Sequence, residues 1–267
     1  MTSGKKARQE RQAVKRPPVR STGGGRSASP KVLAIVAVVI ALAAVAAVAA
    51  FALVGRGSSS SSVSTSTSGL STLPDAEAVI KGFNGIRQQG DVLGSPGAPV
   101  TMVQYIDLQC PVCRAYETEV MPTIVQRYVR QGKLKVITRP VTFIGSDSET
   151  GRRAALAAAL QNRMAQFNQL LYFNQGAENS GWLADDLVTA AYASIPGLNV
   201  QQALNSRNSS AVVAQTRTVD QQVKSDNVLG TPTVFVGKTG GKLTNISPGG
   251  APDVATVEAA IKRAQGQ

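Results

Sequence analysis

The chain has 267 residues, a formal net charge of +12 and no histidine. Without histidine, a serine–histidine–aspartate catalytic triad is excluded. The positive charge would suit a nucleic-acid-binding protein, but residues 1–31 hold nine Lys or Arg and one acid, a net +8 that leaves +4 for the rest. A basic arm for nucleic acid is one interpretation of this tail. The segment that follows favours another, and we expect no nucleic-acid partner.

The basic tail runs into residues 32–54, which are 23 consecutive apolar residues without charge, glycine or proline. As a helix this segment exceeds the roughly 30 Å hydrocarbon core of a bilayer, so it predicts one transmembrane signal anchor. A cleaved signal peptide is the alternative, because Ala47-Val48-Ala49 resembles a cleavage site. The segment is longer than the roughly 7–15 residues of a typical signal h-region, which favours the anchor.

The Lys and Arg residues before the span predict a cytoplasmic N-terminus and a domain outside the cytoplasm, in a single-pass membrane protein. Residues 55–73 are rich in Ser, Thr and Gly, a composition typical of a flexible linker. Residues 74–267 then form one globular domain, long enough to fold around its own core without a structural disulfide.

Within this domain, the hydrophobic pattern predicts α/β structure. A helix is expected over residues 75–89, stopped by Gly90, followed by a strand over 100–106 that is apolar on both faces. Pro111 suits a helix start, so a helix is expected from there to about residue 130, kinked by Pro122. A strand over residues 133–139 completes a βαβ unit.

In the second half of the domain, predicted strands and helices alternate less regularly. Residues 146–227 contain no convincing strand and read as an insertion of several helices. After it we expect a strand over 231–236, a hairpin turn at 238–241, a return strand over 242–247 and a closing helix over 252–265. The pattern is βαβ, helical insertion, ββα.

The chain has two cysteines, and they stand three residues apart in Cys110-Pro111-Val112-Cys113. Three interpretations without redox chemistry compete. A zinc site needs four ligands, and no further Cys or His exists, so no metal is expected. Inert core thiols suit a strand-to-helix junction poorly, and a structural disulfide across so short a loop would stabilise little.

The position of the pair favours redox chemistry. The N-terminus of a helix stabilises a thiolate, so the pKa of Cys110 should be lowered and Cys110 should be the nucleophile. Cys113 lies one turn deeper and can resolve a mixed disulfide while shielded from solvent. Because neither Pro111 nor Val112 carries charge, we expect weaker thiolate stabilisation than in relatives with histidine there, and not a pKa below about 4.

Two segments together resemble the DsbA-like branch of the thioredoxin superfamily: residues 105–113, Tyr-Ile-Asp-Leu-Gln-Cys-Pro-Val-Cys, and residues 230–236, Gly-Thr-Pro-Thr-Val-Phe-Val. The resemblance covers about residue 92 to the C-terminus and implies an α/β, thioredoxin-like fold with a helical insertion. It implies that Pro232 is cis and faces the cysteine pair, and that Thr231 offers backbone hydrogen bonds to an extended substrate. Pro111 and Val112 are the other residues expected to touch the substrate.

Charged residues give weaker signals. Asp107, three residues before Cys110, could relay a proton to or from a buried thiol, or could cap the helix. The remaining candidates are interpreted as solvated helix positions: Glu117, Glu119, Glu149, Arg152, Arg153, Asp185 and Asp186.

The sequence therefore predicts an exported oxidoreductase that forms or exchanges disulfides in secreted proteins and needs no cofactor. Its expected partners are reduced or misoxidised exported proteins, and the resemblance implies reoxidation by a quinone-linked membrane enzyme. The alternatives are a reductase of exported thiols and a non-enzymatic thioredoxin-like module that binds proteins at the membrane.

Overall fold

The structure, a computed structural model, describes residues 72–267. The basic tail, the apolar segment over residues 32–54 and nearly all of the linker lie outside this range. Among the helices of residues 72–267, none is long and apolar enough to cross a membrane.

A mixed sheet of six strands forms the centre of the domain, in the order β1-β2-β4-β3-β5-β6. Its strands are β1 (Gln88–Gln89), β2 (Val92–Leu93), β3 (Val100–Ile106), β4 (Leu134–Pro140), β5 (Thr233–Lys238) and β6 (Thr244–Asn245). The β3 and β4 strands pair in parallel, and all other neighbours are antiparallel. The predicted βαβ unit is confirmed, with β3 central and next to the strand that returns late in the chain.

Every residue of β3 is buried, because the strand is covered on both faces. Val100, Met102 and Ile106 belong to the large core beneath the helices. The odd-numbered positions point to the other face, where Val103 and Tyr105 form a smaller core with residues at the end of the helical insertion. The expected strand with two apolar faces is confirmed.

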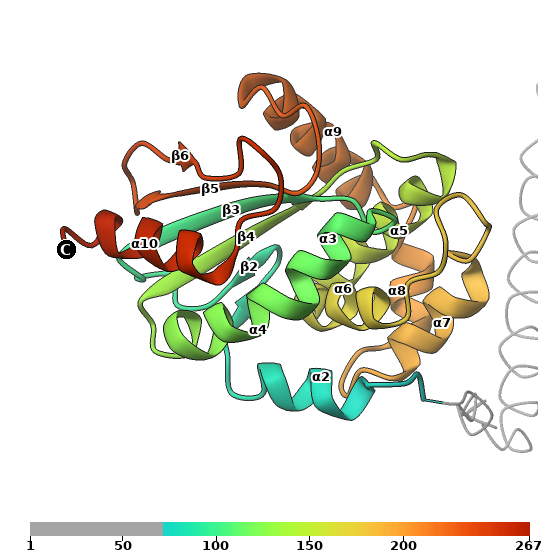
Figure 1. Cartoon of the computed structure of the whole chain (residues 1–267). Coiled ribbons are helices and arrows are strands. Elements are labelled where there is room, and N and C mark those ends of the chain that lie inside the picture. Colours follow the sequence, from blue (N-terminus) through green and yellow to red (C-terminus); the bar gives the residue numbers. More distant parts are fainter. Residues whose placement is uncertain (1–71) are drawn as a thin grey trace, which may run out of the picture. The chain divides into compact units, whose positions relative to one another are not determined.

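Helices account for most of the remaining structure (Figure 1). They are α2 (Ala76–Phe83), α3 (Pro111–Ala115), α4 (Met121–Ile124), α5 (Ser146–Ala159), α6 (Met164–Phe173), α7 (Asp185–Ala193), α8 (Val200–Ser206), α9 (Ser210–Ser225) and α10 (Val254–Ala264). The α3–α4 run and α10 lie side by side over one face of the sheet, with α10 against β5. The predicted insertion of several helices corresponds to α5–α9, and no strand lies between Pro140 and Thr233.

The predicted helix over residues 75–89 is too long. It ends at Phe83, because the chain turns at Gly85 with a positive φ of 75° that favours glycine. The following residues form a small hairpin, with Gln88 opposite Leu93 and Gly90 in its turn at φ 60°. Strands of two residues are too short to leave a hydrophobic period in the sequence.

The long helix after β3 is continuous but irregular. Two π-helical turns, η1 (Tyr116–Val120) and η2 (Val125–Val129), interrupt it on either side of α4. Pro122 lies in α4, directly after the first π turn. Since proline supplies no N–H for the usual helical hydrogen bond, the predicted disturbance around Pro122 takes the form of a wider turn.

Candidate active site

Cys110 occupies the junction between the central strand and the long helix. It is the N-cap residue of α3, in extended conformation (φ −72°, ψ 119°), and Pro111 takes the first helical position. The Cys113 N–H donates to Cys110 Sγ at 3.3 Å. A sulfur atom therefore fills the place at the helix start that a Ser or Asp oxygen usually takes, where unpaired N–H groups stabilise negative charge.

The two cysteines are free thiols, and they differ in access. Cys110 keeps 5% of its surface exposed, whereas Cys113 keeps none. Cys113 is thus shielded as expected from its place one turn deeper in the helix. Pro111 and Val112 are exposed between them, which leaves them open to contact with another molecule.

The thiols also differ in acidity. Hydrogen bonding from the Cys113 side chain lowers the pKa of Cys110 to about 6; Thr231 and the N–H groups of Cys113 and Val112 act in the same direction, and burial opposes them. Burial is the main cause that raises the pKa of Cys113 well above its ordinary value. At neutral pH the reduced pair therefore carries a thiolate at Cys110 and a thiol at Cys113, the polarity that the sequence predicts.

The loop before β5 lies against Cys110 from the far end of the chain. The Thr231-Pro232 peptide bond is cis, as the resemblance implies. Cys110 Sγ lies 3.5 Å from the Thr231 carbonyl oxygen, across 121 residues of sequence, and donates to it when the thiol is protonated. Pro232 is buried and Thr231 half-buried. The fold therefore brings Thr231, with Pro232 next to it in the chain, against Cys110.

Asp107 fixes the loop that leads from β3 to Cys110. Its carboxylate is buried and accepts four hydrogen bonds. The Oδ1 atom accepts from the Gln109 N–H at 2.9 Å and from Ser148 Oγ at 2.8 Å, and Oδ2 accepts from the N–H groups of Phe143 at 2.7 Å and Ile144 at 3.0 Å.

Asp107 does not cap the helix, so that prediction is wrong; the cap of α3 is Cys110 itself. The Asp107 side chain turns instead toward the loop between β4 and α5, and among the described residues its carboxylate makes no hydrogen bond to either thiol. Its backbone carbonyl accepts from the Cys110 N–H at 3.0 Å and from the Tyr172 hydroxyl at 3.0 Å. These contacts fix the Cys110 backbone.

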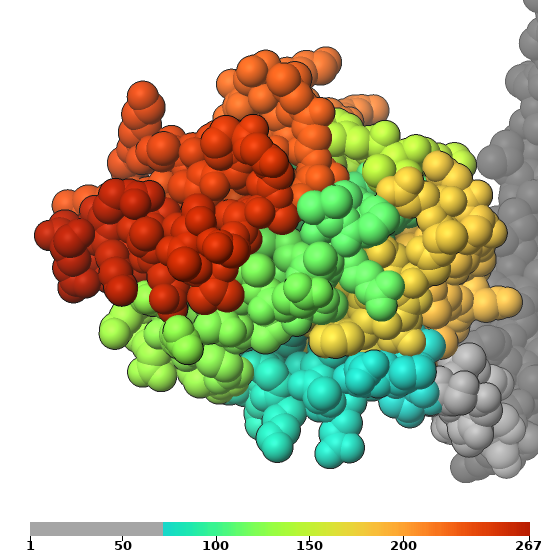
Figure 2. Space-filling view, in the orientation of Figure 1, coloured from blue at the N-terminus to red at the C-terminus, as the bar shows by residue number. Residues whose placement is uncertain are grey.

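The helical insertion also supports this loop, through amides that the sequence analysis did not single out. Gln109 donates to Asn179 Oδ1 at 3.2 Å and accepts from the Asn179 N–H at 2.8 Å. Gln175 donates to the carbonyl oxygens of Leu108 at 2.8 Å and Cys110 at 3.2 Å. In Figure 2 the green segment that contains α3 accordingly surfaces between the yellow insertion and the orange-red C-terminal part.

The interpretation of Arg152 as a solvated position is wrong. Its side chain is buried and lies between Glu149 at 2.7 Å and Asp220 of α9 at 2.6 Å. Glu149 also pairs with Arg153 at 2.6 Å, and Arg153 donates to Asn208 at 2.9 Å. The pairs with Glu149 are local to α5, but Asp220 and Asn208 come from a part of the sequence more than 50 residues later.

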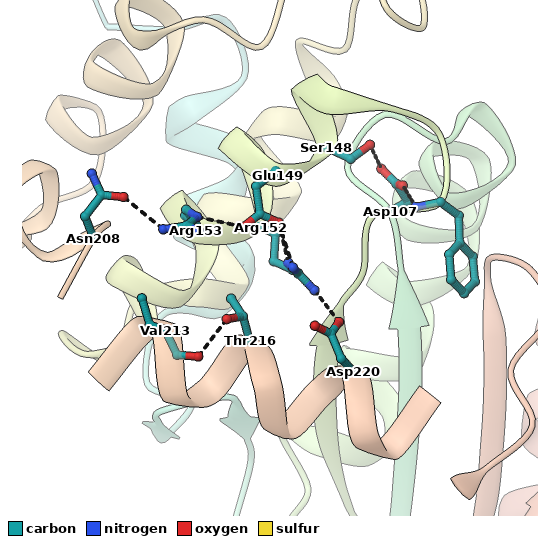
Figure 3. Close-up of polar contacts among 10 residues, drawn as sticks. Asp107, Ser148, Glu149, Arg152, Arg153, Asn208, Val213, Thr216 and Asp220 are labelled. Carbon is teal, nitrogen blue, oxygen red and sulfur yellow. Dashed lines mark hydrogen bonds and ion pairs between the residues drawn. The ribbon is translucent and has the colours of Figure 1, made fainter. Parts of the chain in front are cut away.

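Figure 3 shows two sets of contacts that α5 makes, one with Asp107 and one with α9. Ser148 points toward Asp107 at the active-site loop, and Arg152, one turn later, points toward Asp220 on α9. The α9 helix leads into the loop that bears Thr231. One helix therefore contacts the elements that carry both halves of the site.

The interpretation of Glu117 as solvated is also wrong: only 6% of the residue is exposed. Burial raises the pKa of its carboxyl to about 8. A signal was available, because Glu117 follows the buried Cys113 by four residues and so lies on the same face of the helix. Glu119 and Asp185 are exposed, as expected.

The site has no group that suggests a metal. In the described part of the chain, no three His, Cys, Asp or Glu side chains gather as ligands would. What the arrangement provides is one acidic thiol that can attack or leave and one shielded thiol beside it, which suits thiol-disulfide exchange.

Comparisons with known proteins agree with this chemistry. A family model described as thioredoxin matches residues 87–261. The chain is similar to the Bacillus cereus protein named probable disulfide bond formation protein D, at 28% identity over 174 residues that cover 64% of this chain and 76% of that protein.

Solved structures share the fold. BdbD from Bacillus subtilis, in its oxidised form, has a TM-score of 0.58 at 21% identity and covers 70% of this chain and 95% of that chain. Wolbachia pipientis alpha-DsbA1 has a TM-score of 0.55 at 19% identity, covering 66% and 90% respectively. The chain therefore belongs to the thioredoxin family and is a DsbA-like protein disulfide oxidoreductase.

Proposed function

We propose that the Cys110–Cys113 pair is the redox centre of an exported enzyme that forms or exchanges disulfides in secreted proteins. The observation that carries this proposal is the unequal acidity of two adjacent thiols, with the pKa of Cys110 lowered to about 6 and that of Cys113 raised. A stable thiolate is both a good nucleophile near neutral pH and a good leaving group.

In the oxidising direction, a substrate thiolate attacks Cys110 Sγ of the Cys110–Cys113 disulfide. The bond between the two enzyme sulfurs breaks, and Cys113 leaves and takes up a proton. A second substrate thiolate then attacks the substrate sulfur of the mixed disulfide and releases Cys110 as a thiolate. Two electrons pass from the substrate to the enzyme pair, and the substrate gains one disulfide.

We infer that Thr231 and Pro232 hold the substrate while this exchange occurs. The contact of 3.5 Å between Cys110 Sγ and the Thr231 carbonyl supports a substrate segment that lies along the 230–232 backbone. The exposed Pro111 and Val112 would contact its other side. Asp107 would act as a positioning residue, because its carboxylate oxygens are both already occupied by hydrogen bonds.

We propose further that residues 32–54 anchor the enzyme, with residues 1–31 in the cytoplasm and residues 74–267 outside it. The support is the length of the apolar segment and the charge that precedes it. A tether of this kind would keep the catalytic domain near a quinone-linked membrane enzyme that reoxidises the Cys110–Cys113 dithiol.

A trapping experiment tests the assignment of the two cysteines. Cys113→Ser in the full chain should accumulate a mixed disulfide with a disulfide-bonded substrate protein, because the Cys110 thiolate attacks the substrate disulfide, one substrate sulfur leaves as a thiolate, and the shielded resolving thiol is gone. Cys110→Ser should accumulate none, since Cys113 is buried. Glu119→Gln, an exposed position on the same helix, is the matched control and should turn over normally.

The products are counted as mixed disulfides on non-reducing gels. Equal trapping by both cysteine variants would contradict the division of roles. Normal cellular function of the Cys110→Ser, Cys113→Ser double variant would favour the binding-module alternative.

A further inference from the structure

A small internal cavity lies among the active-site helix, the central strand and α6. Its volume is about 20 Å³, and most of its lining is apolar. Five polar side chains also line it: Gln104 from β3, Thr138 from β4, Glu117 from the η1 turn, and Asn168 and Gln169 from α6. None of them is exposed by more than 9%.

The hydrogen bonds of these side chains are incomplete. Gln104 Nε2 donates to Glu117 Oε1 at 2.6 Å and to Thr138 Oγ1 at 3.1 Å. Gln104 Oε1 and Asn168 Oδ1 are buried acceptors that find no donor among the described residues. Burying an acceptor without a donor is unfavourable, because the acceptor loses its hydrogen bonds to water, so two such acceptors beside one cavity need an explanation.

Glu117 supplies a hydrogen-bond donor. Burial raises the pKa of its carboxyl to about 8, so the group carries a proton at neutral pH. The lining of the cavity contains no lysine or arginine to offset a charge there. The titratable groups around this part of the core are Cys113 and Tyr116 on the same helix and Tyr172 on α6, and burial keeps each of them protonated by raising its pKa.

We propose that the cavity holds one water molecule, which accepts a hydrogen bond from the protonated carboxyl of Glu117 and donates to Gln104 Oε1 and Asn168 Oδ1. A water needs roughly 10–15 Å³ and two to four polar partners, and the cavity offers both. This arrangement gives both unpaired acceptors a donor and the carboxyl proton an acceptor. It requires the neutral form of Glu117, since a carboxylate has no hydrogen to donate.

The site fastens the active-site helix at an irregular turn. Glu117 lies in the π turn one helical turn after Cys113, and its backbone carbonyl accepts from Gln169 Nε2 at 2.7 Å. The water joins this turn to β3 and α6. A neutral Glu117 also keeps a second negative charge away from the thiolate of Cys110.

The same site makes the stability of the fold depend on pH between about 4.5 and 8. Below the ordinary pKa of 4.5, Glu117 is protonated in the folded and unfolded chain alike. Between 4.5 and about 8 only the folded state keeps the proton, so its contribution to stability is lost progressively as pH rises through this window. Each pH unit lowers the folding equilibrium constant by up to about tenfold.

Infrared spectroscopy of the full chain and its Glu117→Gln variant tests the protonation state. We expect a neutral-carboxyl C=O band at pH 7 that fades above about pH 8 and is missing in Glu117→Gln. The exposed Glu119→Gln variant should retain the band. A band that is absent from the wild type at pH 7, or unchanged in Glu117→Gln, would overturn the proposal.

Two further measurements test the water and the pH dependence. A crystal structure should show one ordered water within hydrogen-bond distance of Gln104 Oε1, and a dry cavity would overturn the proposal.

Urea unfolding tests the pH dependence. The stability of Glu117→Gln relative to the wild type should rise from pH 5 to pH 8, by up to about tenfold in the ratio of the two folding constants per pH unit. Its amide can still donate to the water. A gain that does not change with pH would contradict a neutral Glu117.

Discussion

At the residue scale, the chemistry depends on the contrast between two sulfur atoms in one helical turn. Cys110 receives hydrogen bonds at the helix start, and Cys113 is buried beneath it. Since Val112 contributes only its backbone N–H to this arrangement, the acidity of Cys110 depends chiefly on Cys113. The pKa of about 6 is lower than that of an ordinary thiol and higher than the extreme that a histidine between the cysteines would favour.

A substitution of Cys113 should therefore change the titration of Cys110. In the reduced wild type, thiolate absorbance and alkylation rate should titrate with a midpoint near pH 6. Cys113→Ala removes the largest cause of the lowered pKa, so the midpoint should rise. Val112→Ala retains the backbone N–H and is the control expected to titrate as the wild type does. An unchanged midpoint in Cys113→Ala would show that the helix N-terminus alone sets the acidity.

At the scale of secondary-structure elements, Asp107 connects the end of β3 to the loop that precedes α5. Four hydrogen bonds to one buried carboxylate explain why this loop lies against the active site. The sequence placed Asp107 near the cysteines but could not identify three of its four partners, which lie 36–41 residues later in the chain.

Asp107→Ala should destabilise the fold by about 2–4 kcal/mol, because several buried donors lose their acceptor together. If Asp107 is a positioning residue, exchange should be slower while the midpoint of its pH profile stays near 6. Asp107→Asn retains an acceptor oxygen and should recover part of the stability. Urea unfolding and exchange rates measured across pH check both expectations; a shifted midpoint with intact stability would favour a proton relay.

At the scale of the whole molecule, the order of elements was predictable and the packing was not. The βαβ unit and the helical insertion follow from residue spacing, and the cysteine motif with Gly230-Thr231-Pro232 indicated the site. The hairpin of β1 and β2 was missed because its strands have two residues each. The burial of Glu117 and Arg152 was missed because it depends on α6 and α9, which pack against them from distant parts of the sequence.

The asymmetric pair also sets an expectation for the direction of electron flow. A stabilised Cys110 thiolate favours the reduced enzyme and so makes its disulfide more oxidising. Thioredoxin has a nucleophile pKa of about 7 and DsbA one of about 3.5, so a value of about 6 lies between them. The potential of this enzyme should likewise lie between theirs.

The most direct test is the redox potential of the Cys110–Cys113 pair in the full chain, measured by thiol trapping across glutathione and dithiothreitol buffers. We predict a reversible two-electron couple that is more oxidising than about −270 mV and less oxidising than about −120 mV. A potential at or below about −270 mV would contradict a disulfide donor and indicate a reductase. If no reversible disulfide forms at any poise, the pair is not the redox centre.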